Sequence, residues 1–195
     1  MENSTTRLLK TYKVDIPAVK FVGRKYSEEE KKDGTFGRLW SEWFAGGWFE
    51  PLEALIEDPG FIEDGDAYCG MSRIFDDGTW EYWIGMIVPE SADVPTGYES
   101  FAIPACSAVT NWVYGKEPDV YFHCCLKDME EQGYVWTAIP SGERLMTERC
   151  LSASPDANND LCERRIEVDI DLPITCDIFG KRKILNIFFL ISQYS

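Results

Sequence analysis

Two copies of the tripeptide Ile-Pro-Ala, at residues 16–18 and 103–105, constrain the fold more than any other feature of this sequence. Each copy begins an apolar segment rich in β-branched and aromatic residues, and is followed by a helix-like pattern and two strand-like patterns. The last strand pattern ends at a proline in both halves, Pro89 and Pro173. The spans from Pro17 to Pro89 and from Pro104 to Pro173 have near-equal lengths. This repeated order predicts a tandem β-α-β-β duplication in which each half packs against its copy.

In the first half, residues 18–26 predict a strand that is reached through an edge or bulge at Pro17. Residues 35–56 predict a helix that ends or kinks at Gly46-Gly47, followed by a second short helix. Residues 67–90 predict two strands joined by a tight turn at residues 76–78. The first helix carries a wide apolar stripe, which in most helices is core: Phe36, Leu39, Trp40, Trp43 and Phe44.

In the second half, residues 101–115 predict a strand and residues 116–134 a helix that Gly133 caps. Residues 143–174 predict a β-hairpin closed by a loose acidic loop. In its second strand the acidic residues, Glu167 among them, alternate with apolar ones, and we interpret them as a solvated face. The apolar tail at residues 184–191 is too short to span a bilayer. We expect it to form a packed addition to the sheet rather than a dimerisation element.

Glu148 is an acidic residue in the middle of a predicted strand, in a protein whose sheet should be built largely from aromatic residues. A buried carboxylate costs several kcal/mol unless something pairs with it. Two interpretations stay open from the sequence. In the first, Glu148 faces solvent and pairs with Arg149, Arg164 or Arg165. In the second, Glu148 is functional, either as the counter-ion of a cationic ligand or as an acid/base group that activates water.

The number of aromatic residues exceeds what a core of this size needs, since the chain has 7 Trp and 14% aromatic residues. Trp80, Tyr82 and Trp83 cover both faces of one strand, so one set should line a pocket. A flat cation is well bound by aromatic rings around a single carboxylate. The candidate ligand-binding residues are therefore Glu148, Tyr82, Trp40, Phe44, Trp112 and Trp136.

The net charge of −15 argues against direct binding to nucleic acid or to anionic membranes, and favours cationic small molecules or a basic partner. The chain has 7 Cys without a Cys-x-x-Cys spacing and one His, His123, so we expect reduced thiols in a cytoplasmic protein and no metal site. The sequence contains no glycine-rich phosphate loop after a strand, and no cofactor is expected. Monomer and homodimer both remain open.

The order of these elements, the Ile-Pro-Ala strands, residues 82–86, Thr147-Glu148-Arg149-Cys150 and residues 166–174 together resemble the GyrI-like family, over roughly residues 12–174. This family comprises the effector-binding domains of AraC- and MerR-type regulators. The resemblance implies an α+β fold: a curved antiparallel sheet with two main helices and a ligand groove between the modules. Glu148 matches the family's central Glu, Tyr82 an aromatic position and Glu167 an acidic one, whereas Cys150 stands where a Tyr is usual.

The resemblance implies one domain over residues 1–195, with modules at about 10–90 and 100–174 and an atypical extension at 175–195. No helix-turn-helix pattern is present, so we expect a stand-alone sensor or sequestering protein for lipophilic, planar or cationic compounds. Two alternatives follow from the family. One is a hydrolase of cyclopropane-bearing DNA-alkylating compounds, with Glu148 acting on a water molecule. The other is an acidic inhibitor of DNA gyrase.

Overall fold

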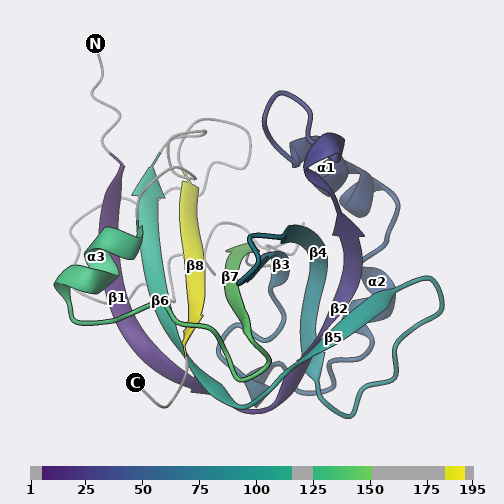
Figure 1. Cartoon of the computed structure of the whole chain (residues 1–195). Helices are drawn as coiled ribbons and strands as arrows, with labels where there is room; N and C mark the ends of the chain where they lie inside the picture. The colour runs from purple at the N-terminus through teal and green to yellow at the C-terminus, as the bar shows by residue number, and fades with distance from the viewer. Residues whose placement is uncertain (1–5, 116–124, 151–182, 192–195) are drawn as a thin grey trace.

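The computed structural model describes residues 6–115, 125–150 and 183–191, which form one antiparallel sheet of eight strands with short helices (Figure 1). The architecture of these residues is α+β, as predicted. The strands are β1 (Arg7–Ile16), β2 (Val19–Tyr26), β3 (Tyr68–Phe75), β4 (Trp80–Pro89), β5 (Glu99–Ile103), β6 (Cys106–Gly115), β7 (Glu143–Cys150) and β8 (Lys183–Ile191). The helices are α1 (Gly37–Ala45), α2 (Glu50–Glu53) and α3 (Cys125–Glu131), with 3-10 turns at Glu28–Glu30 and Pro59–Phe61.

The strand order is β1-β6-β8-β7-β3-β4-β2-β5, and its two halves mirror each other. In the first half the last strand, β4, lies between β2 and β3, and in the second half β8 lies between β6 and β7. The halves meet where β3 pairs with β7. Residues distant in sequence are therefore brought together at the centre of the sheet.

Each Ile-Pro-Ala tripeptide marks the point where a long extended segment changes its pairing partner. β1 pairs with β6 and β2 pairs with β5, so the two segments cross where Ile16 faces Cys106 and Val19 faces Ile103. A proline cannot donate a ladder hydrogen bond, and Pro17 and Pro104 fall in the breaks between the paired stretches.

The first-half predictions are largely confirmed. The helix ends at Ala45, Gly47 adopts a positive φ of 65°, and a second short helix begins at Glu50. β3 and β4 are joined by the turn that contains Gly78. The predicted strand at residues 18–26 is β2, and residues 7–16 form a further strand. In the second half α3 begins at Cys125, and residues 116–124 of the predicted helix lie outside the described residues.

The pairing predicted for the second hairpin is wrong. β7 has β3 on one side and β8 on the other, so its partner is the apolar tail and not the strand that was expected to end at Ile174. The register runs from Met146 opposite Phe189 to Arg149 opposite Asn186. A nearly continuous apolar run suits an interior strand better than an alternating acidic one does. Residues 151–182, including Glu167, lie outside the described residues.

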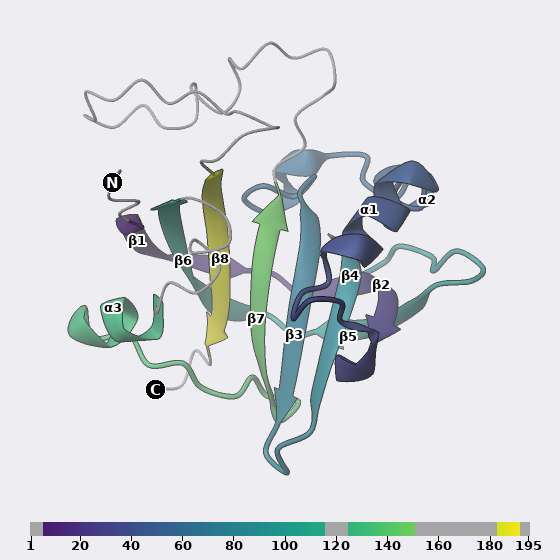
Figure 2. The same cartoon turned by 90° about the horizontal axis from the view of Figure 1, so that it is seen from above.

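The helices cover the same face of the sheet, called the helix face below. α1 and α2 pack on β2 and β4 through a cluster that contains Trp43, Leu52 and Ile84. α3 packs on β6 and β8 through a cluster that contains Met129 and Phe189. In Figures 1 and 2, α1 and α2 lie on one side and α3 on the other, with β8, β7 and β3 between them.

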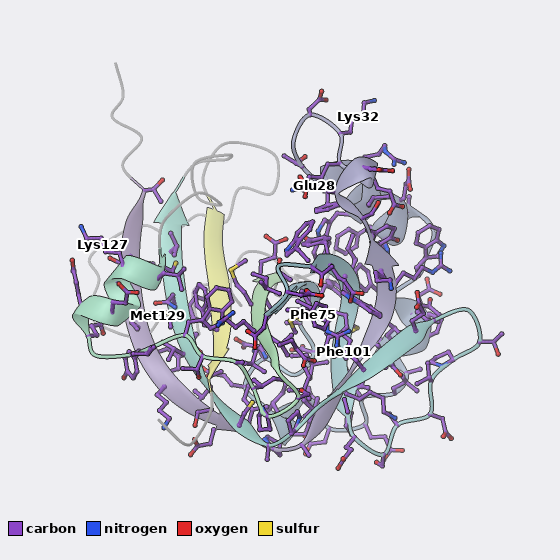
Figure 3. The ribbon with its side chains drawn as sticks, in the orientation of Figure 1. Glu28, Lys32, Phe75, Phe101, Lys127 and Met129 are labelled. Carbon is purple, nitrogen blue, oxygen red and sulfur yellow. The ribbon has the colours of Figure 1, made fainter. Side chains whose placement is uncertain are left out.

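Burial within each element agrees with this arrangement. Met129 is fully buried beneath α3, whereas Lys127 is exposed on the outer side of that helix (Figure 3). The opposite face of the sheet holds a separate core, which includes Phe21, Met71, Trp83 and Leu145. The sheet is thus apolar on both faces, as the run of buried residues in β4 shows.

Gly23 and Gly85 face each other in β2 and β4, where the two backbones approach so closely that no side chain fits between them. A Cβ atom at Gly85 would lie 2.1 Å from the carbonyl oxygen of Val22, which is backbone and cannot rotate away. We expect Gly85→Ala to lower the free energy of unfolding by about 2 kcal/mol or more, as in overpacked cores. Urea unfolding followed by circular dichroism measures this loss.

Gly37→Ala is the matched control, since a Cβ atom there would meet only the hydroxyl of Thr35 at 3.5 Å. Alanine is favoured over glycine in a helix by up to about 1 kcal/mol. This variant should therefore be as stable as the unmodified protein or more so. Equal stability of the two variants would contradict the packing described for the glycine pair.

Candidate functional site

Glu148 lies in the middle of the sheet and not at its edge. It faces Gly70 of β3 on one side and Ile187 of β8 on the other. The register places its side chain on the helix face, two positions from Met146, which packs under Trp136 and Phe189. The carboxylate is half-buried. Glu148 therefore sits between the part of the sheet covered by α1 and the part covered by α3.

The Tyr82 side chain crosses β3 to reach Glu148. Its hydroxyl donates a hydrogen bond to Oε1 of the carboxylate. The indole Nε1 of Trp40 donates to the same hydroxyl oxygen at 2.9 Å, so a relay of two hydrogen bonds runs from α1 to β7. Phe36 stacks on the Tyr82 ring with a centroid distance of 4.0 Å and an interplanar angle of 3°. Because its ring and its hydroxyl are both held, Tyr82 presents a fixed donor to the carboxylate.

Gly70 makes this contact possible. A Cβ atom at Gly70 would lie 2.3 Å from the Tyr82 hydroxyl oxygen and 2.6 Å from Oε1 of Glu148. The two side chains therefore meet in the space above this glycine. A glycine within a strand indicates a bulge or a close approach of other groups, and this signal was available in the sequence. Gly70 was not among the site residues predicted from the sequence.

Aromatic rings from α1 and β3 form one wall beside this contact. Phe44 is 52% exposed and stacks against Trp40 with a centroid distance of 6.1 Å. The Tyr68 ring, two residues before Gly70, meets Phe44 edge to face at 5.2 Å. Burial, and after it a hydrogen bond to Glu53, raise the pKa of the Tyr68 hydroxyl above its ordinary value. By contrast, Trp43 is fully buried and belongs to the core, as predicted for most of the stripe.

Trp136 stands on the other side of Glu148. Its indole Nε1 donates to the carbonyl oxygen of Leu145 at 3.1 Å, which ties the ring to β7. The ring meets Phe189 of β8 edge to face at 5.3 Å and packs with Met146. Trp136 and the aromatic wall from α1 thus flank Glu148 on the same face of the sheet.

Trp112 does not join this group. Neighbouring residues of β6 pack under α3, and Trp112 projects from the opposite face, where its Nε1 donates to the Tyr12 hydroxyl at 3.1 Å. That hydroxyl donates in turn to Glu63 at 2.5 Å. Burial and the hydrogen bond to Glu63 raise the pKa of Tyr12. Of the six predicted site residues, contacts join Glu148, Tyr82, Trp40 and Phe44, whereas Trp136 packs beside Met146 on the same face and Trp112 lies in a separate polar network.

The alternative pairing of Glu148 with Arg149 does not fit the geometry. Consecutive strand residues point to opposite faces, and Arg149 is 2% exposed on the face away from the helices. Its Nη1 donates to the carbonyl oxygen of Glu63 at 2.5 Å. Burial lowers the pKa of Arg149. Arg164 and Arg165, the other two partners considered, lie outside the described residues.

Within residues 6–115, 125–150 and 183–191, histidine, cysteine and carboxylate side chains form no group of three or more that could hold a metal ion. Over the same residues, no helix is both long and apolar enough to cross a membrane. The described residues of the candidate site offer one carboxylate, hydroxyl and indole donors, and aromatic rings.

Neither family models nor curated proteins show a significant match to this chain. Solved structures do match. A proposed bacterial transcription regulation protein from Staphylococcus aureus MU50 aligns with a TM-score of 0.55 and 12% identity, covering 94% of this chain and 99% of its own. SAV2435 bound to tetraphenylphosphonium aligns with a TM-score of 0.47 and 17% identity, covering 95% of both chains. The EcmrR C-terminal domain aligns with a TM-score of 0.45 and 15% identity, covering 94% of this chain and 98% of its own.

At these identities the comparison establishes the fold alone. The staphylococcal protein shares the arrangement described above over almost its full length. The observed fold agrees with the α+β fold that the sequence resemblance implied.

A double-mutant cycle on Tyr82→Phe and Glu148→Gln tests the central contact of the site. Hydrogen bonds to charged groups contribute about 1.5–3 kcal/mol, so we expect a coupling energy of at least about 1 kcal/mol in urea unfolding. Tyr98→Phe is the control partner, because its hydroxyl donates to the carbonyl oxygen of Trp48 away from Glu148. The control cycle should be additive, and additivity of both cycles would contradict the contact.

Proposed function

We propose that this protein binds lipophilic aromatic cations on the helix face of the sheet, with Glu148 as their counter-ion. The observation that carries the proposal is the half-buried carboxylate held by Tyr82 and flanked by aromatic rings on both sides. A carboxylate in such surroundings is stabilised by a cation, which compensates for the hydration lost on burial.

The bound cation would be held by two kinds of contact. The negative charge of Glu148 would pair with the positive charge of the ligand, while Oε1 accepts the hydrogen bond from the Tyr82 hydroxyl. Rings such as Trp40, Phe44 and Trp136 offer faces or edges to a flat molecule, and a desolvated cation–π contact contributes up to about 2 kcal/mol. The net charge of −15 raises the local concentration of cations around the protein.

We further propose that the two halves of the sheet are tandem repeats and that the ligand lies between them. The equivalent pairings of β2-β4-β3 and β6-β8-β7 support this duplication. The site combines Tyr82 from the first half with Glu148 from the second, across the β3–β7 pair where the halves meet. The second repeat would then extend to β8 and include most of the apolar tail.

The biological role that fits such a site is that of a sensor or a sequestering protein. The staphylococcal protein with this fold is described as a proposed transcription regulation protein, and effector binding is a role of that kind. Binding without conversion of the ligand distinguishes this role from the hydrolase alternative, and mass spectrometry of the recovered ligand makes the distinction.

Glu148→Gln keeps the shape of the side chain and removes its charge. We expect this variant to bind the planar cation ethidium at least about tenfold more weakly, the equivalent of about 1.4 kcal/mol. The neutral relative 6-phenylphenanthridine should lose less than about threefold, since it has no charge to pair. Quenching of tryptophan fluorescence reports both affinities.

Glu130→Gln is the matched control, because it removes one negative charge from an exposed position on α3. It should leave both affinities unchanged apart from a small effect of net charge. Unchanged ethidium affinity in Glu148→Gln would show that the cation binds elsewhere and would reject the proposed site.

A further inference from the structure

A transverse row of residues crosses the helix face at the level of Glu148. Thr11 of β1 faces Asn111 of β6, Asn111 faces Ile187 of β8, and Ile187 faces Glu148. Gly70 continues the row into the first half. Asn111 and Glu148 therefore project from the same face, separated by one intervening strand, or about 10 Å at the usual strand spacing.

Asn111 is fully buried, with 0% exposure. The hydroxyl of Thr11 donates to its Oδ1 at 2.8 Å. Its Nδ2 has no hydrogen-bond partner among the described residues. In this assignment the nitrogen end of the amide is therefore unsatisfied among the described residues.

Among the described residues, the surroundings of Asn111 on the helix face are apolar. Its neighbours on the same face of β6, Val109 and Val113, are fully buried in the apolar cluster under α3. That cluster also contains Cys125 and Met129 of the helix. A buried amide group without a partner destabilises the folded state, and such groups are uncommon in native proteins. An acceptor brought by a ligand would relieve this cost.

We propose that Asn111 is a second polar anchor of the binding site, which selects cations that carry a hydrogen-bond acceptor. The inference rests on the proposed function of Glu148. The positive group of the ligand pairs with Glu148, and a carbonyl or ether oxygen further along the molecule accepts a hydrogen bond from Nδ2 of Asn111. An elongated ligand of this class lies along the row, across β8. Short cations without an acceptor reach only Glu148.

Two cations that differ only in the acceptor test this directly. Biphenyl-4-yl-trimethylammonium has no acceptor, whereas its 4′-acetyl derivative carries a carbonyl oxygen at a distance from the nitrogen comparable to two strand spacings. We expect the unmodified protein to bind the acetyl derivative at least about tenfold more tightly, as one additional buried hydrogen bond would give. Isothermal titration calorimetry measures both affinities.

Asn111→Leu removes the amide and keeps a side chain of similar size. This variant should lose the preference for the acetyl derivative, retain its affinity for the plain cation within about threefold, and unfold at a higher temperature than the unmodified protein. A purely structural amide would predict a lower unfolding temperature. Thr110→Val is the matched control: Thr110 is also fully buried with a hydroxyl that lacks a partner among the described residues, but it lies on the opposite face.

The outcomes separate this inference from the proposal on which it rests. Equal affinities of the two cations for the unmodified protein, or a preference that survives in Asn111→Leu, would overturn the role of Asn111. Loss of the preference in Thr110→Val would overturn it as well. If Glu148→Gln binds both cations as tightly as the unmodified protein, the proposed function itself fails. A binding defect of Glu148→Gln together with an intact preference in Asn111→Leu rejects the second anchor alone.

Discussion

The hydrogen bond between Tyr82 and Glu148 is the interaction on which the rest of the candidate site depends. It joins strands from the two halves of the chain across β3, and it needs Gly70 at that crossing because a side chain there would occupy the same space. Trp40 holds the hydroxyl from α1, and Phe36 holds the ring. A contact that requires the correct register of three strands and the docking of one helix reports on much of the fold at once.

The two faces of the sheet around β7 carry different polar chemistry. On the helix face, Glu148 meets hydroxyl and indole donors among aromatic rings. On the opposite face, Arg149 is buried and donates to the carbonyl oxygen of Glu63, in the segment before β3. The Glu63 side chain in turn accepts from Tyr12 of β1, whose hydroxyl accepts from Trp112 of β6. A charge buried in apolar surroundings is expensive unless it is paired. Adjacent residues of one strand therefore have distinct surroundings: Arg149 holds a connecting segment on one face, and Glu148 accepts a hydrogen bond from Tyr82 on the other, where we propose that it pairs with a cation.

Local patterns predicted most of the elements, whereas the register decided the site. The Ile-Pro-Ala breaks, the end of α1 at Gly46 and the turn before β4 follow from backbone chemistry that neighbouring residues determine. Glu148 and Tyr82 were identified because a carboxylate and an aromatic excess are visible in the sequence. The place of β8 was missed because its partner β7 is more than thirty residues away, and an apolar run does not specify its neighbour. Trp112 was assigned to the site because the sequence does not show which face of β6 it occupies. The roles of Gly70 and Asn111 could not be recognised from the sequence, because the residues that face them belong to neighbouring strands.

We propose above all that Glu148 and the aromatic residues on either side of it bind a cation on the helix face of the sheet. A crystal structure of the protein with ethidium tests this most directly. We expect the phenanthridinium ring over β7 and β3, with its charged nitrogen nearest Glu148 and its edges against Phe44 or Trp136. Electron density for the dye on the opposite face beside Trp112, or on the exposed surface with Glu148 in contact only with Tyr82, would contradict it.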